Sequence, residues 1–194
     1  MNRKSNKFMG LSFLTIVMLV VLDQLTKFLA VIKLKNSIPF VLIDGVFELK
    51  YLENQSAAFG VDVVSLFQRI FKIKYFIENP DAFLRTKMIF FVVVTVVVVV
   101  LLVILYKRIP STKRFFWMNI MLIFFIAGAI GNLIDRIVNN YVVDFFYFKL
   151  INFPIFNVAD IYVTVAAFAF IVLGIFYYKE EDFEIIFPKR DKKR

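Results

Sequence analysis

The chain has 194 residues, of which 61% are hydrophobic, and its mean hydropathy is +0.79. A soluble domain of this size carries less apolar surface, so the composition indicates an integral membrane protein. The sequence contains no cysteine and no histidine, which excludes disulfides, thiolate nucleophiles, imidazole bases and Cys/His zinc sites. By elimination, carboxylates are the leading candidates for catalysis.

Four stretches are long and apolar enough to cross a bilayer, since about 20 helical residues span its hydrocarbon core. These stretches are approximately residues 8–32, 88–106, 115–134 and 155–178. The valine run at 92–100 is typical of a strand in water, but an open strand in lipid leaves its backbone groups unpaired, so we predict a helix there. The sequence therefore predicts an all-α polytopic membrane protein with four transmembrane helices in a single membrane domain.

The distribution of cations, rather than the net charge of +9, predicts the orientation. Lys and Arg are dense before the first helix, in the link 107–114 and in the tail 179–194. Because cytoplasmic loops carry such an excess, we expect both termini in the cytoplasm and the connections 33–87 and 135–154 outside. Basic tails of this kind contact anionic lipid rather than nucleic acid, so we expect membrane lipid and no nucleic acid among the partners.

The predicted outer segment 33–87 contains structure of its own. Residues 41–52 alternate between apolar and polar side chains around Asp44-Gly45, which predicts a hairpin or a small extracytoplasmic β platform. Residues 63–77 have a helical apolar periodicity with basic residues between, which predicts an interfacial amphipathic helix.

Polar residues gather near one depth of the predicted bundle. Ionisable groups at membrane depth are costly and usually belong to a pathway or a site. At a rise of 1.5 Å per residue, the outer half of the first helix, the outer end of the third, the following connection and the first turns of the fourth all contribute to this level. The set comprises Asp23, Asn132, Asp135, Arg136, Asp144, Asn157 and Asp160.

Structural roles compete with chemical ones at some of these positions. Asp135 next to Arg136 favours an ion pair or a loop anchor over an acid catalyst. Asp23 and Lys27, one helical turn apart, favour a pair within the first helix. The asparagines at 132 and 157 suit either hydrogen bonds between helices or a contact with a substrate backbone, and the residues alone leave both options open.

Asp160 is the hardest of the acids to explain structurally, because it has no cation within a helical turn. For Asp144, surface exposure and function remain equally open. When two carboxylates meet, one keeps a proton while the other stays basic, and such a pair activates water and protonates a leaving amide. Asp144 and Asp160 are the best candidates for this aspartyl protease chemistry, because the segment between them contains Pro154 and can fold back.

Four blocks of sequence, taken together and in order on four spans, are specific. They are Asp23-Gln-Leu-Thr-Lys27, Asn54-Gln-Ser-Ala-Ala-Phe-Gly60, Gly131-Asn-Leu-Ile-Asp-Arg136 continuing to Val142-Val-Asp-Phe145, and Phe156-Asn-Val-Ala-Asp160. Over nearly its whole length the chain resembles bacterial lipoprotein signal peptidase, also called signal peptidase II. Ser56 and Ala127 stand where that family commonly has glycine, and residues 63–85 form an expanded region.

The resemblance implies an intramembrane aspartyl endopeptidase with Asp144 and Asp160 as its catalytic dyad. It also implies a substrate-binding site shaped by Asn54, Asn132, Arg136 and Asn157, with Asp23 in support. The implied substrate is a prolipoprotein signal peptide, cut just before a cysteine that already carries diacylglycerol. The implied setting is the bacterial cytoplasmic (inner) membrane, with the active site near the outer leaflet. We expect a monomer without metal or cofactor.

Other classes of protein also place carboxylates among helices. A small transporter would normally show a polar relay through the membrane or repeated halves, whereas these groups gather on one side. A non-catalytic assembly factor would tolerate substitution of either aspartate. A Ser/Lys protease using Ser56 lacks an obvious lysine base.

Overall fold

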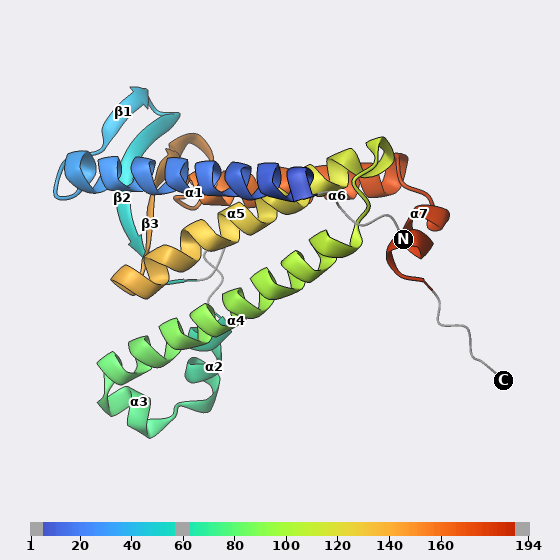
Figure 1. Ribbon diagram of the computed structural model, residues 1–194. Coiled ribbons are helices and arrows are strands. Elements are labelled where there is room, and N and C mark those ends of the chain that lie inside the picture. Colours follow the sequence, from blue (N-terminus) through green and yellow to red (C-terminus); the bar gives the residue numbers. More distant parts are fainter. Residues whose placement is uncertain (1–5, 57–62, 189–194) are drawn as a thin grey trace.

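The computed structural model describes residues 6–56 and 63–188 (Figure 1). Within them, four helices are long and apolar enough to cross a membrane. They are α1 (Asn6–Leu34), α4 (Pro80–Arg108), α5 (Phe116–Asn139) and α6 (Val158–Phe176). The predicted fold class, a helical multi-pass membrane protein, is therefore confirmed.

Helix α5 is the centre of the bundle and packs against α1, α4 and α6. The other three helices expose many apolar side chains, as expected of surfaces that face lipid. Two glycines let the neighbouring helices approach α5 closely. A Cβ atom at Gly128 would lie 2.6 Å from the backbone oxygen of Ala159, and one at Gly131 would lie 2.5 Å from Oδ2 of Asp23.

Two helix boundaries differ from the predicted ones. Helix α4 begins at Pro80 rather than near residue 88, because proline suits the first helical turn and charged side chains are tolerated there. Helix α5 continues to Asn139 and ends where Asn140 adopts the left-handed conformation, at φ 61°. Asp135 and Arg136 therefore lie inside a helix and not in the connection that follows it.

A three-stranded antiparallel sheet lies at the end of the bundle opposite α7 (Glu180–Ile186) (Figure 1). Its strands, in spatial order, are β1 (Phe40–Ile43), β2 (Phe47–Asn54) and β3 (Val142–Phe148). The β1–β2 pair confirms the predicted hairpin, with Gly45 at φ 66° in the turn. Strand β3 was not predicted. It pairs Asp144 with Leu52, so Asp144 lies on a strand and not in a loop.

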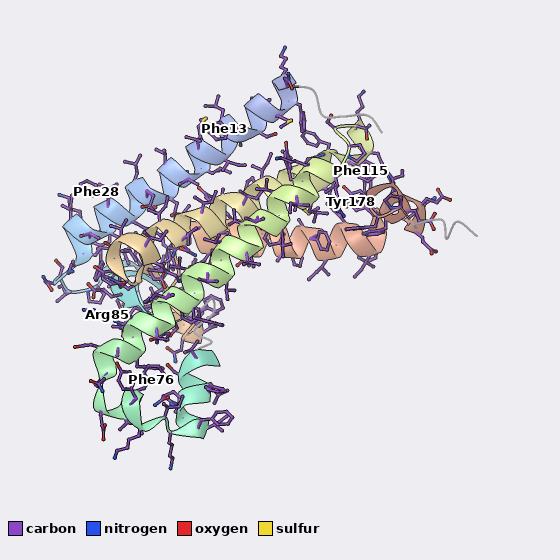
Figure 2. The ribbon with its side chains drawn as sticks, turned by 60° about the horizontal axis from the view of Figure 1, so that its bottom comes forward. Phe13, Phe28, Phe76, Arg85, Phe115 and Tyr178 are labelled. Carbon is purple, nitrogen blue, oxygen red and sulfur yellow. The ribbon has the colours of Figure 1, made fainter. Side chains whose placement is uncertain are left out.

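The predicted interfacial helix is divided into α2 (Val63–Phe71) and α3 (Lys74–Glu78). The division falls at Lys72, whose positive φ of 45° interrupts the helical path. Helix α2 exposes a stripe of large apolar side chains, including Leu66 and Ile70, as an interfacial helix requires. Helix α3 packs on the start of α4, where the rings of Phe76 and Phe83 lie 5.6 Å apart (Figure 2).

Helix α7 is anchored to the start of α5 by polar contacts. Arg114 donates to Asp182 at 2.6 Å and to the backbone oxygen of Tyr177 at 2.6 Å. The hydrogen bonds that Arg114 donates to Asp182 hold the pKa of this carboxyl below its usual value. The backbone N–H of Met118 donates to the hydroxyl of Tyr178.

Candidate active site

Asp144 and Asp160 line the same cavity, which has a volume of about 560 Å³. Its walls come from β2, α4, α5, β3 and α6 and from the segment 151–156 between β3 and α6. Asn54, Asn132 and Arg136 also line it. The structure thus brings together at this cavity most of the site residues that the sequence singled out.

Asp144 is buried, with 1% of its surface exposed, which decides against the surface role that the sequence left open. Its Oδ1 accepts a hydrogen bond from Nδ2 of Asn157 at 2.6 Å, and its Oδ2 accepts one from Nδ2 of Asn54 at 2.7 Å. Burial, assisted by the negative charge of Asp160, raises the pKa of Asp144 to about 7, against the opposing effect of the two asparagines. A carboxyl group of this kind keeps its proton below about pH 7, far above the pH at which an exposed aspartate loses it.

Asp160 is fixed by the beginning of α6. Asn157 caps this helix by accepting a hydrogen bond from the backbone N–H of Asp160 at 2.9 Å, and its own N–H donates to Oδ2 of Asp160 at 3.1 Å. This reciprocal arrangement is a capping box. The Oδ1 atom of Asp160 accepts a hydrogen bond from Nδ2 of Asn132 at 2.8 Å. The sequence is therefore locally suited to hold this carboxylate in one orientation.

The two acids are linked through Asn157. Its backbone contacts Asp160 while its side chain contacts Asp144, and the same Nδ2 also donates to Oδ1 of Asn132 at 3.1 Å. Asn157 has no exposed surface. One buried residue thus sets the geometry of both carboxylates at once.

A buried ion cluster centred on Lys27 adjoins the two acids through Asn132, which contacts both Lys27 and Asp160. The ammonium group of Lys27 lies 2.9 Å from Oδ2 of Asp23, 3.0 Å from Oδ2 of Asp135 and 2.9 Å from Oδ1 of Asn132. These three acceptors match the three N–H donors of an ammonium group. The predicted pair within the first helix is confirmed. Asp135 has the structural role that the sequence favoured, but its ion pair is with Lys27 of another helix and not with Arg136.

The cluster also holds the backbone beside each candidate catalytic acid. Oδ1 of Asp23 accepts from the N–H of Ala159 at 2.8 Å, and Oδ2 of Asp135 accepts from the N–H of Val143 at 3.0 Å. Ala159 and Val143 directly precede Asp160 and Asp144 in the chain. Asp23 and Asp135 therefore position the two acids through the backbone.

Gln24 completes the cluster and was not singled out from the sequence. Its Nε2 lies 3.2 Å from Oδ2 of Asp23, 3.1 Å from the backbone oxygen of Gly131 and 3.0 Å from Oδ1 of Asp135. The only signal in the sequence was its place beside Asp23 in a polar interruption of an apolar helix.

Arg136 reaches the cavity from α5 and is partly exposed. Its Nη2 donates to the backbone oxygen of Ser56 at 3.3 Å, and its guanidinium lies 5.6 Å from the ring centre of Phe91. In the described part of the chain it forms no salt bridge. Among the described residues, Arg136 thus keeps most of its donors available to a ligand in the cavity.

Two further expected features concern the block that begins at Asn54 and the absence of a metal. Residues 57–60 of the block that begins at Asn54 lie outside the described residues. Among the residues that are described, no group of three or more acidic side chains is arranged to hold a metal ion, and the expectation of a metal-free site stays a prediction.

Comparisons with known proteins agree with this architecture. A family profile described as signal peptidase (SPase) II matches residues 15–176. A lipoprotein signal peptidase from Clostridium tetani (strain Massachusetts / E88) is 35% identical over 178 residues, which cover 90% of this chain and 96% of that protein. Another from Streptococcus pyogenes serotype M5 (strain Manfredo) is 36% identical over 180 residues, which cover 88% of this chain and 94% of that protein.

Two solved structures described as bacterial membrane enzymes have a similar fold. One matches with a TM-score of 0.68 at 27% identity and covers 90% of this chain and 92% of its own. The other matches with a TM-score of 0.67 at 26% identity and covers 92% of this chain and 99% of its own. The four apolar helices and these likenesses define a multi-pass membrane enzyme. The chain belongs to the signal peptidase II family, a family of proteases.

Proposed function

We propose that the chain is an intramembrane aspartyl endopeptidase that removes the signal peptide from diacylglyceryl-modified prolipoproteins, with cleavage just before the lipidated cysteine. The observation that carries the proposal is the pair of acids, Asp144 and Asp160, held by Asn157 in one apolar cavity. An apolar cavity suits a signal peptide in the membrane, and a pair of carboxylates in different environments suits acid and base roles.

In the proposed mechanism Asp144 is the acid and Asp160 the base. Asp144 keeps its proton up to about pH 7, because burial raises its pKa to about 7. Asp160 takes the role of base in this proposal, and its two oxygens accept hydrogen bonds from Asn132 and from the backbone N–H of Asn157.

The bond changes follow from these protonation states. Asp160 takes a proton from a water molecule whose oxygen attacks the scissile carbonyl carbon, while Asp144 gives its proton to the carbonyl oxygen. When the C–N bond breaks, Asp160 passes its proton to the leaving amine and Asp144 recovers one from the diol. No metal or cofactor takes part in these steps.

The surrounding polar residues have supporting roles in the proposal. Asn54 and Asn157 hold Asp144, Asn132 holds Asp160, and Arg136 offers its free donors to a substrate carbonyl. Asp23 acts through the backbone of Ala159.

The proposed setting rests on the distribution of charge. The basic N-terminus, the basic link 107–114 and the basic tail favour a cytoplasmic location for both termini. The acids then lie near the outer leaflet of the bacterial cytoplasmic membrane, where the lipid chains of a modified cysteine remain anchored. We propose that the enzyme acts as a monomer.

The test uses purified protein in lipid vesicles with a diacylglyceryl-modified proprotein, whose shortening is followed by gel shift. Asp144→Asn and Asp160→Asn are each expected to lower kcat by at least about 100-fold, the lower limit for a missing acid or base. Asp182→Asn is the control, since Asp182 lies outside the cavity. Full cleavage by either dyad variant, as a non-catalytic assembly factor predicts, or a requirement for a divalent ion would contradict the proposal.

A further inference from the structure

Thr164 lies one helical turn beyond Asp160 on α6 and lines the same cavity. Residues four apart share a face of a helix, so Thr164 continues the face that carries Asp160. At 1.5 Å per residue it lies about 6 Å deeper in the span. The neighbouring parts of the wall, such as Val94 and Val98 of α4, are apolar.

The hydroxyl of Thr164 differs from those of the other helical threonines. Thr15, Thr86 and Thr95 each donate to the backbone oxygen four residues earlier, at 2.9, 2.8 and 2.7 Å. Thr26 donates to the oxygen three residues earlier at 2.7 Å. Within residues 6–56 and 63–188, the hydroxyl of Thr164 forms no hydrogen bond. Threonine in an apolar helix normally satisfies its hydroxyl on its own backbone, so the hydroxyl of Thr164 remains available to a ligand in the cavity.

A substrate in this cavity needs such a partner. A peptide bond must leave the helical state before two carboxylates and a water molecule can reach it, and unwinding frees the backbone groups of the residues beside it. In hydrocarbon these groups have no water to bind, and leaving them unpaired is costly. Thr95 also lines the cavity, but its hydroxyl is already used by the oxygen of Phe91.

We propose that Thr164 is a positioning residue whose hydroxyl donates a hydrogen bond to the unwound backbone of the signal peptide. This inference rests on the proposed peptidase function. An extended chain advances about 3.3 Å per residue, so a depth of about 6 Å below Asp160 corresponds to about two residues. The acceptor is therefore the carbonyl oxygen two residues before the scissile carbonyl, on the side of the signal peptide.

The first experiment compares Thr164→Val, Thr164→Ser and the wild type on a lipidated proprotein peptide in vesicles. Removal of one hydrogen bond to the substrate is expected to lower kcat/KM about tenfold for the valine variant. Serine keeps the hydroxyl and is expected to restore most of the loss. Thr15→Val, with the same change on α1 away from the cavity, is expected to match the wild type. All variants should keep the unfolding temperature of the wild type.

The second experiment replaces one amide bond of the peptide by an ester bond. The amide chosen contains the carbonyl two residues before the scissile carbonyl, and an ester carbonyl is a weaker hydrogen-bond acceptor than an amide carbonyl. The ester is expected to slow the wild type several-fold and to have no further effect on Thr164→Val. Independent effects of the two changes, or a valine variant within twofold of the wild type, would overturn the role of Thr164. Failure of the wild type itself to cleave, or cleavage by Asp160→Asn, would instead overturn the proposed function.

Discussion

Replacing Lys27 by methionine tests whether the buried ion cluster supports the fold. Methionine keeps much of the length and volume of the side chain but removes the charge that pairs with Asp23 and Asp135, at 2.9 and 3.0 Å. The lysine is 2% exposed, and the two acids are 0% and 2% exposed. Water therefore cannot replace the lost partner.

Removing one partner of a buried ion pair costs about 3–5 kcal/mol, because the remaining charge has no compensation. In a chain of this length each kcal/mol corresponds to about 2–4 °C. The unfolding temperature of Lys27→Met should thus fall by about 6–20 °C. The fall in unfolding temperature can be measured by circular dichroism, as the loss of the helical signal when the protein is heated in detergent micelles.

The matched control is Lys35→Met, because Lys35 lies 2.9 Å from Glu53 but the side chains of this pair are 39% and 38% exposed. Exposed pairs contribute little, so its unfolding temperature should not change measurably. In Lys27→Met, the second change Asp135→Asn removes one stranded charge and should return part of the lost stability. Equal unfolding temperatures for the two lysine variants would refute the reasoning.

Three further results are expected from the site. Cleavage should decline as pH rises through about 7, because Asp144 loses its proton there. A rate that is flat from pH 5 to 9 would exclude Asp144 as the acid. Asn54→Ala should move the midpoint of this decline to higher pH by roughly 0.5–1 unit, because the lost hydrogen bond favours the ionised form of Asp144. An unchanged or lower midpoint would count against this role of Asn54. Gly131→Ala should lower the free energy of unfolding by about 1–3 kcal/mol, because the added methyl group crowds Asp23. Gly174→Ala is the control, since open space surrounds Gly174 and the change should not destabilise the chain. Similar losses in both variants would point to a general effect of added side chains.

The elements with strong local signals could be predicted from the sequence. Hydropathy alone located the four membrane helices, and the Asp44-Gly45 turn located the hairpin. The third strand lacks such a signal, since its run Val-Val-Asp-Phe-Phe-Tyr-Phe does not alternate between polar and apolar residues. Its partner strand is also far away in the sequence, as the Leu52–Asp144 register shows.

The polar set could be predicted, but the partners within it could not. Adjacent helical residues do not face each other, which is why Asp135 does not pair with Arg136 and instead meets Lys27 from another helix. The link through Asn157 depends on a helix start and a strand that meet only in the folded chain. The vacant hydroxyl of Thr164 is likewise visible only when the bonds of the other threonines are compared.

The dependence of both acids on Asn157 has a consequence for biogenesis. This residue caps the start of α6, and Ala159, two residues further on, donates its backbone N–H to Asp23 of α1. A polypeptide that is still being synthesised lacks these contacts. On the proposed mechanism it therefore cannot cleave other membrane proteins while it is being inserted. On this view the chain becomes able to cleave in a single late step, when α6 packs against α1.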